Sequence, residues 1–155
     1  MKNKVLEHKE AVNIKLGNGY TLMVEREDYT YEDDCKDTYY HLVIYYRKKY
    51  FVDISDYIKY SDCKVLPNDT IDEIRQKVFN YLNNKWVGIE DLQGCDFKVG
   101  DSMTLKEWKE WAISDRNTCD DDYGYSLIKR TPLKHIIKLI EDYWELSIKK
   151  IVLVK

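Results

Sequence analysis

The stretch KLGNGYTL, residues 15–22, places a glycine-rich turn between two segments of alternating apolar residues and indicates a β-hairpin. The register of a hairpin must put apolar side chains on one face, because a one-residue slip moves every side chain to the other face. A two-residue turn at Asn18-Gly19 would pair Leu16 with Thr21 and mix apolar with polar residues. A three-residue loop, Gly17-Asn18-Gly19, instead pairs Leu16 with Tyr20, Ile14 with Leu22 and Val12 with Val24. We therefore predict the three-residue loop, in a hairpin over about residues 10–26.

A second hairpin is indicated over about residues 38–55, where TYYHLVIYY (38–46) and YFVDIS (50–55) flank three basic residues. Closing the turn over residues 47–49 pairs Tyr46 with Tyr50, Ile44 with Val52 and Leu42 with Ile54. On residues 38–46, alternation places Tyr39, His41, Val43 and Tyr45 on the face opposite Tyr40, Leu42, Ile44 and Tyr46. Two successive hairpins predict an antiparallel sheet.

Three helices are expected to cover that sheet. Capping boxes at Thr70/Glu73 and Thr104/Glu107 predict helices over about residues 70–83 and 104–113. Pro132 at a first helical position predicts a third over about residues 132–146. The apolar spacing could continue this last helix, but the β-branched residues near the carboxyl end favour a strand over 148–154. The helical stripes predict burial of the indoles of Trp108, Trp111 and Trp144.

These elements predict an α+β fold in a single domain over residues 1–155. The four cysteines include no Cys-x-x-Cys pair, which argues against a zinc site, and no metal or other cofactor is expected. The amino-terminal residues contain no apolar leader region, and no apolar run is long enough to span a membrane. We therefore expect a cytoplasmic protein with reduced thiols and no membrane partner.

Charge is unevenly distributed along the chain, whose net charge is −3. The run EREDYTYEDDCKD (25–37) has seven acids against two bases, and DRNTCDDDY (115–123) is also acidic. Both runs lack helical or strand periodicity, which predicts solvated loops. Residues 123–155 have seven Lys or Arg residues against three acids, so the carboxyl-terminal part is basic.

One motif could indicate an enzyme: Glu107-x-Lys109 with Asp96 or Asp101 upstream. Metal-dependent nucleases use such carboxylates to bind a divalent cation and such a lysine to stabilise developing charge. That chemistry needs the glutamate and lysine on one face of a strand. Here both fall in a capped helix, where residues two apart point in different directions. We therefore predict that the protein is not an enzyme and has no catalytic residue.

Tyrosine is concentrated in one part of the chain, because ten of the fourteen tyrosines lie between Tyr20 and Tyr60. Tyrosine supplies large contact area at low entropy cost, and neighbouring acids select a cationic partner. Free nucleic acid does not fit this surface, because its affinity depends on neutralising phosphates with Lys or Arg. A bacterial nuclease, or another protein with a basic nucleic-acid channel, fits better. The predicted partner-binding residues are Glu27, Asp28, Tyr29, Tyr31, Glu32, Asp33, Asp34, Tyr39 and Tyr45.

The glycine-turn hairpin (Leu16-Gly17-Asn18-Gly19-Tyr20) and the acidic aromatic run (Asp28-Tyr29-Thr30-Tyr31-Glu32-Asp33-Asp34) sit in a compact chain rich in Lys, Asn and Tyr. This make-up resembles that of small accessory proteins of low-GC bacterial phages and plasmids, among them anti-restriction and anti-CRISPR inhibitors. The resemblance covers general make-up and no diagnostic motif, so no site residue carries over from it. It implies a non-enzymatic inhibitor that sequesters a nuclease, with DNA mimicry as one mode.

An alternative function follows from the basic carboxyl-terminal helix. Arg130, Lys134 and Lys138 recur every four residues, the spacing of a phosphate-contacting stripe. The alternative is a nucleic-acid-binding accessory protein that uses these three side chains.

Overall fold

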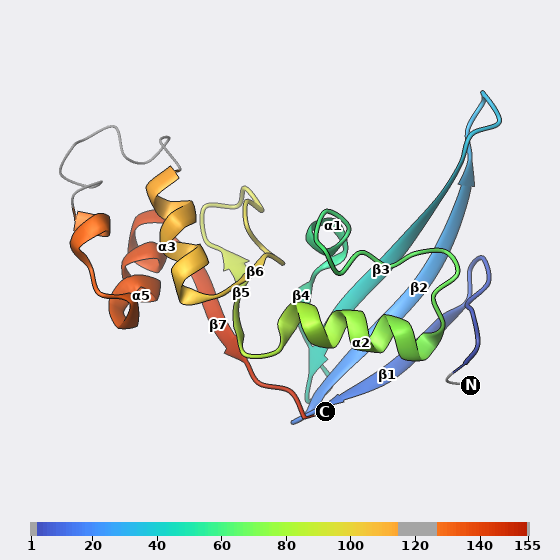
Figure 1. Cartoon of the computed structure of the whole chain (residues 1–155), viewed down its shortest axis with the longest axis horizontal. Coiled ribbons are helices and arrows are strands. Elements are labelled where there is room, and N and C mark those ends of the chain that lie inside the picture. The colour runs from blue at the N-terminus through green and yellow to red at the C-terminus, as the bar shows by residue number, and fades with distance from the viewer. Residues whose placement is uncertain (1–2, 115–126, 155) are drawn as a thin grey trace. The chain divides into compact units, whose positions relative to one another are not determined.

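The computed structural model describes residues 3–114 and 127–154 of the chain (Figure 1). It is a mixed α+β structure with one four-stranded and one three-stranded antiparallel sheet. The chain divides into two compact units, which we describe separately: unit 1 comprises residues 1–83 and 152–155, and unit 2 comprises residues 84–151. Whether the chain behaves as a single domain stays a prediction. Among the described helices, none is long and apolar enough to cross a membrane.

Unit 1 contains a sheet whose strands follow one another in chain order, β1-β2-β3-β4. Its elements are β1 (Ala11–Gly17), β2 (Tyr20–Thr30), β3 (Lys36–Tyr46), β4 (Lys49–Asp53), α1 (Ser55–Ile58) and α2 (Ile71–Leu82). Both predicted hairpins are therefore confirmed, as β1–β2 and β3–β4. Hairpin connections join strands that are neighbours in the sequence, so each pairing closes only a short loop.

The first hairpin keeps the predicted register but has a shorter turn. Val12 pairs with Val24 and Ile14 with Leu22, as expected. Asn18 and Gly19 both have positive φ, 53° and 87°, and form a two-residue turn with Gly17 opposite Tyr20. The predicted three-residue loop is therefore wrong. The structure has a bulge between Lys15 and Gly17, which holds one extra residue. The apolar pattern led us to place that residue in the loop.

The second hairpin departs from prediction in the same way. Arg47 and Lys48, at φ 49° and 68°, form a two-residue turn, and Tyr46 pairs with Lys49 rather than with Tyr50. A register shift beside Ile44 restores the predicted pair with Val52. In both hairpins a two-residue turn and a one-residue bulge together leave the apolar face where the sequence predicts it.

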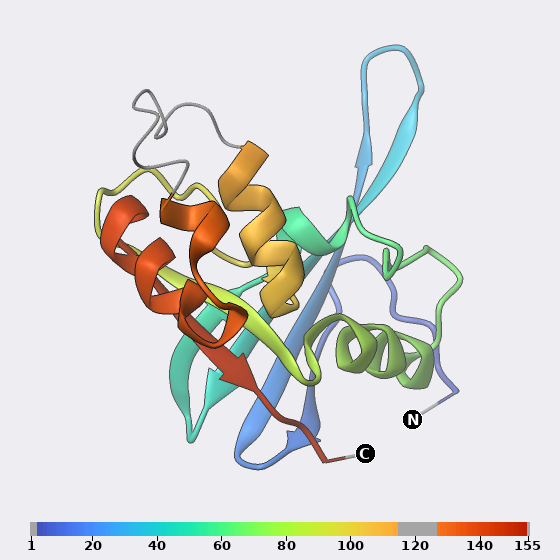
Figure 2. The same ribbon diagram turned by 60° about the vertical axis from the view of Figure 1, so that its left-hand side comes forward.

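The core of unit 1 lies between this sheet and α2, which lies across one face of the sheet (Figures 1 and 2). Helix α2 matches the predicted helix over 70–83, and the Thr70 hydroxyl accepts the amide of Glu73 at 3.2 Å as its cap. The predicted alternation on β3 is confirmed for its central residues: Tyr40, Leu42 and Ile44 are buried. The residues between them are only half-buried.

Unit 2 contains the second sheet, in the order β6-β5-β7. Its elements are β5 (Lys85–Asp91), β6 (Ser102–Met103), α3 (Leu105–Ser114), α5 (Leu133–Trp144) and β7 (Leu146–Ile151). Trp108 and Trp144 are buried in its core as predicted, and the Trp108 indole donates to the carbonyl of Trp86 at 2.8 Å. Trp111 is half-buried, with its ring centroid 5.6 Å from that of Trp108.

Three predictions about these later elements need correction. The predicted single sheet packed by three helices is wrong, because α3 and α5 belong to unit 2 and pack with its own strands. Strand β5 was not predicted. The helix expected over 132–146 ends at Trp144, because Glu145 takes a left-handed conformation (φ 51°), and β7 occupies 146–151 rather than 148–154.

Candidate functional site: the acidic arm and the groove beside it

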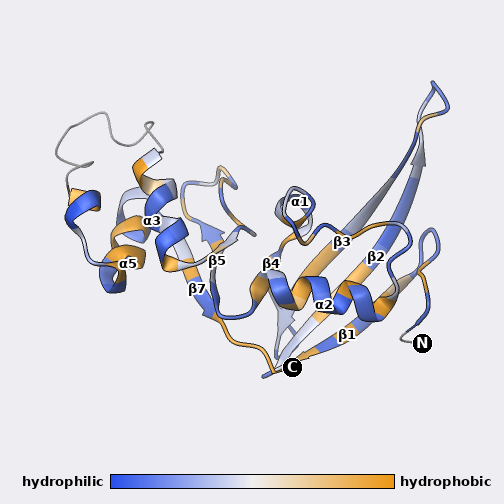
Figure 3. Cartoon of the chain, viewed as in Figure 1, coloured by the Kyte–Doolittle hydropathy of each residue, from blue (hydrophilic) through white to orange (hydrophobic). Residues whose placement is uncertain are grey.

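The acidic run over residues 25–37, which we call the acidic arm, is a β-ribbon and not the predicted loop. Residues 25–30 belong to β2 and residues 36–37 to β3, so only residues 31–35 form a turn. Pairing of β1 with β2 stops at Glu25, and pairing of β4 with β3 begins only at Val43. The two long strands therefore project beyond their neighbours as a two-stranded ribbon (Figures 1 and 2) whose outer part is mostly hydrophilic (Figure 3). The other acidic run, 115–123, lies outside the described residues.

At the base of the arm, Glu27 already has partners within unit 1. One of its carboxylate oxygens lies 3.5 Å from Lys9 Nζ and 3.5 Å from His41 Nε2, and the other accepts the hydroxyl of Tyr29. The Tyr29 hydrogen bond is the largest of the influences that hold the pKa of Glu27 below its usual range. With a side chain 17% exposed, Glu27 contributes first to holding the arm together.

Asp28 also has hydrogen-bond partners within the arm. Its Oδ1 accepts from Arg26 Nε and from the Thr38 hydroxyl, both at 2.9 Å. The hydrogen bond from Arg26 is the main reason that the pKa of Asp28 lies below its usual range. Arg26 also donates to the main-chain carbonyls of Leu6 and Pro67, both at 2.8 Å. Asp28 therefore belongs to a network that ties the base of the arm to the rest of unit 1.

The tip of the arm, residues 31–35, presents its side chains to solvent. Tyr31 is 54% exposed, and Glu32 and Asp34 are exposed. The turn is closed by main-chain hydrogen bonds, from the Tyr31 amide to the Cys35 carbonyl at 2.8 Å and from the Asp34 amide to the Tyr31 carbonyl at 3.0 Å. Asp33 accepts the Cys35 amide at 3.2 Å. The tip is thus a structured turn that carries three adjacent acids.

The two remaining predicted residues lie away from the tip. Tyr45 packs edge-on against Tyr50, with ring centroids 6.4 Å apart. Tyr39 donates its hydroxyl to Asp56 at 2.9 Å. Burial, followed by this hydrogen bond, raises the pKa of Tyr39 to about 12. The structure therefore divides the predicted partner-binding set into an internally paired base, an exposed tip and two separate tyrosines.

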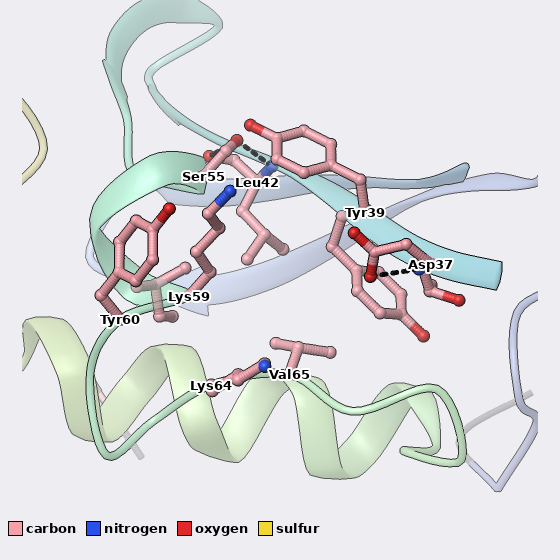
Figure 4. A pocket seen from close by; sticks show the side chains of 11 residues that line it. Asp37, Tyr39, Leu42, Ser55, Lys59, Tyr60, Lys64 and Val65 are labelled. Atoms are coloured by element: carbon pink, nitrogen blue, oxygen red, sulfur yellow. Dashed lines mark hydrogen bonds between the residues drawn. The ribbon is translucent and has the colours of Figure 1, made fainter. Parts of the chain in front are cut away.

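A groove beside β3 has no counterpart among the sequence predictions. A cavity of about 260 Å³ lies between residues 37–42 of β3 and residues 55–65, which follow β4 (Figure 4). Leu42, Ile58 and Val65 line its apolar part. Lys59 Nζ lies 5.5 Å from the ring centroid of Tyr39 and 5.0 Å from that of Tyr60, which is 81% exposed. No local motif joins these residues, because they come from segments that only the fold brings together.

One group of described side chains could converge on a metal ion. Single ligand atoms of Glu25, Glu27 and His41 lie within 4.8 Å of one another. Glu25 and His41 are paired across β2 and β3, and Glu27 follows on the same face of β2. Glu27 contacts Lys9, His41 and Tyr29, so two of the three side chains already have protein partners.

The residues of the nuclease-like motif have separate structural roles in unit 2. The Thr104 hydroxyl caps α3 by accepting the Glu107 amide at 3.2 Å, and it donates to the Glu107 carboxylate at 3.2 Å. Lys109 donates to the carbonyl of Thr131 at 2.8 Å. Asp101 lies 3.6 Å from Lys98 Nζ, and burial raises its pKa. Asp96 is exposed in the segment between β5 and β6.

The predicted basic stripe is interrupted in the structure. Lys134 and Lys138 are exposed on α5, which begins at Leu133. Arg130 lies in the preceding helical turn, before the break at Thr131 and Pro132, so it does not share the helical face of the two lysines. Only Lys134 and Lys138 of the predicted stripe therefore lie on one helix.

No family model, curated protein or solved structure matches this chain. Its function must therefore be inferred from its own geometry and charge.

Proposed function

We propose that the protein is a non-enzymatic inhibitor of the anti-CRISPR or anti-restriction type, which binds a bacterial nucleic-acid enzyme through the tip of the acidic arm. The observation that carries this proposal is the projecting β-ribbon over residues 25–37, with its seven acids and its exposed turn. An inhibitor that blocks a channel needs a rigid, charged projection and no catalytic group.

The geometry of a β-ribbon suits occupation of a nucleic-acid channel. An antiparallel strand rises about 3.4 Å per residue, and one strand of B-form DNA has one phosphate per about 3.4 Å of helix axis. Carboxylates on one face of such a strand are two residues apart, about 6.8 Å, which matches the axial rise of two phosphates of that DNA strand. Glu25, Glu27 and Asp37 share one face of the ribbon, and Asp28 lies on the other.

The tip supplies the contacts that are still available to a partner. Glu32 and Asp34 are exposed, and Tyr31 adds an exposed ring beside them. Aromatic side chains dominate the binding energy of many interfaces, while charge complementarity mainly sets the association rate and the choice of partner. Tyr29, at 42% exposed, extends the aromatic contact along the ribbon. We therefore narrow the binding surface from the nine predicted residues to Tyr29, Tyr31, Glu32, Asp33 and Asp34.

The test is charge reversal at the tip. The triple variant Glu32→Lys, Asp33→Lys, Asp34→Lys should lose about 100-fold in affinity for the target enzyme. Its melting temperature should fall only slightly, because all three side chains are exposed and only Asp33 loses a hydrogen bond, the one from the Cys35 amide. A matched control reverses three exposed acids elsewhere, Asp62→Lys, Glu110→Lys and Asp142→Lys, and changes net charge equally. Affinity and inhibition should be measured against a panel of bacterial nucleases at two salt concentrations. Equal loss in both variants would show a net-charge effect and contradict the proposed site.

The same experiment separates the alternative, a nucleic-acid-binding protein. That function predicts that reversal of Arg130, Lys134 and Lys138 to glutamate abolishes a gel shift with DNA or RNA, and that the tip variant binds nucleic acid at least as well as the wild type. Our proposal predicts no gel shift by the wild type at physiological salt. Direct binding of wild-type protein to DNA under those conditions, unchanged by the tip substitutions, would overturn the inhibitor proposal.

A further inference from the structure

The edge of β3 that faces away from β2 is only partly covered within unit 1. Strand β4 pairs with β3 over Val43–Tyr46 alone, so no strand in the described part of unit 1 pairs with this edge over residues 36–41. An uncovered edge presents main-chain amides and carbonyls that another strand can pair with. Proteins bind extended peptides by this means, as an added strand.

The direction of the main chain shows which residues offer these groups. At Leu42 the amide donates to Ser55 Oγ at 2.8 Å, and the carbonyl accepts the Ile54 amide at 3.0 Å. Both groups of Leu42 therefore point away from β2. Main-chain groups of successive strand residues point to opposite edges, so those of Tyr40 and Thr38 share the direction of Leu42.

The neighbouring strand confirms this direction at Tyr40. Arg26 pairs with Tyr40 across β2 and β3, yet its amide donates to Glu10 at 3.1 Å and its carbonyl accepts from Lys9 at 2.8 Å. The main-chain groups of Arg26 therefore point away from β3, so they form no hydrogen bond with the main chain of Tyr40. The Thr38 amide is bonded by the neighbouring Asp37 side chain at 2.9 Å, a local contact that an incoming strand can replace.

The groove beside β3 runs along the same edge. Asp37, Thr38, Tyr39, Tyr40 and Leu42 form its β3 side. The opposite side comes from residues 55–65, with Ile58 and Val65 contributing apolar surface. In Figure 4 the β3 ribbon and the segment carrying Lys59, Lys64 and Val65 enclose this space. An added strand would thus meet main-chain partners on one side and an apolar cavity for an alternate side chain on the other.

Charge decides which strand can occupy the edge. The edge leads directly into the acidic arm, whose seven acids face two bases. Two copies of this chain paired in parallel along this edge would place their two arms side by side, where like charges across a ladder are destabilising. A strand that carries Lys or Arg where it passes the arm gains attraction there, and its aliphatic residues can lie beside Lys59 and Lys64 of the groove.

We propose that this edge and groove bind an extended cationic segment of another protein, which pairs with Thr38 and Tyr40 as an added strand and places one aliphatic side chain between Leu42, Ile58 and Val65. The site is distinct from the tip of the arm. It can operate whether or not the tip enters a nucleic-acid channel.

The experiment uses the full chain, labelled with ¹⁵N, and a synthetic peptide of sequence KTKVKLKTK as the probe. Titration should shift the amide resonances of residues 36–42 and slow the hydrogen exchange of the Tyr40 amide by about tenfold. Two control peptides match the probe. One carries N-methyl groups on alternate amides, which removes donors but keeps charge, and the other replaces every lysine with glutamate. Neither control should bind.

Two variants locate the site from the protein side. Thr38→Pro removes an amide that points to the uncovered edge, so pairing with β2 should survive while the probe no longer binds. Val65→Trp should fill the cavity and weaken binding, and melting curves check that both variants fold. Binding that persists in both variants, or that N-methylation leaves unchanged, overturns the proposal. Concentration-dependent protection of Tyr40 without peptide would identify a second copy as the occupant and overturn it as well.

Discussion

The two sheets of this molecule are assembled from different kinds of sequence. In unit 1, four strands follow one another through short turns, so each strand pairs with its neighbour in the chain. In unit 2, β5 pairs with β7, although residues 92–145 separate them. The first sheet is therefore specified by local patterns, whereas the second depends on contacts that form only when distant segments meet. Substitutions in each unit can test how far this difference extends to stability.

The largest effect is expected at Gly88, in the centre of β5. A Cβ at this position would lie 2.3 Å from the carbonyl oxygen of Lys98, and the adjacent main chain leaves that oxygen little freedom. Gly88→Ala should therefore cost about 3 kcal/mol in the free energy of unfolding, at the upper end of typical overpacking. Chemical denaturation with hydrogen exchange should show the loss in unit 2, while β1–β4 keep their protection.

A matched substitution isolates the cause. Gly94 has a positive φ of 76°, but a Cβ added there would meet no atom within 4 Å. Gly94→Ala should thus report backbone strain alone, at about 1 kcal/mol. If Gly88→Ala costs no more than Gly94→Ala, the close approach at Lys98 does not limit unit 2.

The helix caps offer a more even comparison, because each unit has one. Thr70 caps α2 and Thr104 caps α3, each accepting an amide at 3.2 Å. Thr70→Ala and Thr104→Ala should each cost about 1 kcal/mol, the usual value for a lost hydroxyl cap. Exchange rates should show each loss within its own unit. A global loss from either substitution would mean that the units unfold together.

Asp101 should give a smaller, pH-dependent effect in unit 2. Burial raises its pKa, so the folded state prefers the protonated form. The corresponding stability is present below the unfolded pKa and is lost as pH rises through the folded value. Asp101→Asn should therefore raise the melting temperature more at pH 7 than at pH 3. The opposite result would show that the ion pair with Lys98, at 3.6 Å, outweighs burial.

Tyr39 should give the smallest effect, visible only in alkali. Its pKa is raised to about 12 by burial and by Asp56, so the folded state prefers the neutral phenol. This contribution is constant below pH 10 and is lost between about pH 10 and 12. The pKa values of Tyr20, Tyr29 and Tyr40 are also raised, so absorbance titration should show several late-titrating tyrosines, and Tyr39→Phe should remove one of them. Unchanged titration in that variant would assign the late group elsewhere.

The features that could be predicted are those encoded by a pattern of neighbouring residues in the sequence. The pairs Val12–Val24 and Ile44–Val52 follow from apolar alternation, and Thr70 marks the start of α2. The turn lengths were wrong because a two-residue turn plus a bulge has the same parity as a three-residue loop. Alternation alone cannot distinguish the two arrangements.

The missed features leave no such pattern. The arm has the sequence of a loop, because strands that extend beyond a core are solvated on both faces and show no period of two. Strand β5 was hidden by Gly88 and by a register shift between Gly88 and Glu90. The groove combines residues 37–42 with residues 55–65, and only the fold shows that they are neighbours.

The return of the chain to unit 1 after β7 has a consequence for the order of synthesis. The Leu153 amide bonds the Asn83 side chain at 2.8 Å, and Asn18 donates to the Val152 carbonyl at 2.7 Å, so both residues belong to unit 1. On the ribosome, residues 1–83 emerge well before residues 152–154, and the whole of unit 2 is made between them. The core of unit 1 therefore cannot be completed before unit 2 has been translated, because the buried side chain of Leu153 is synthesised last.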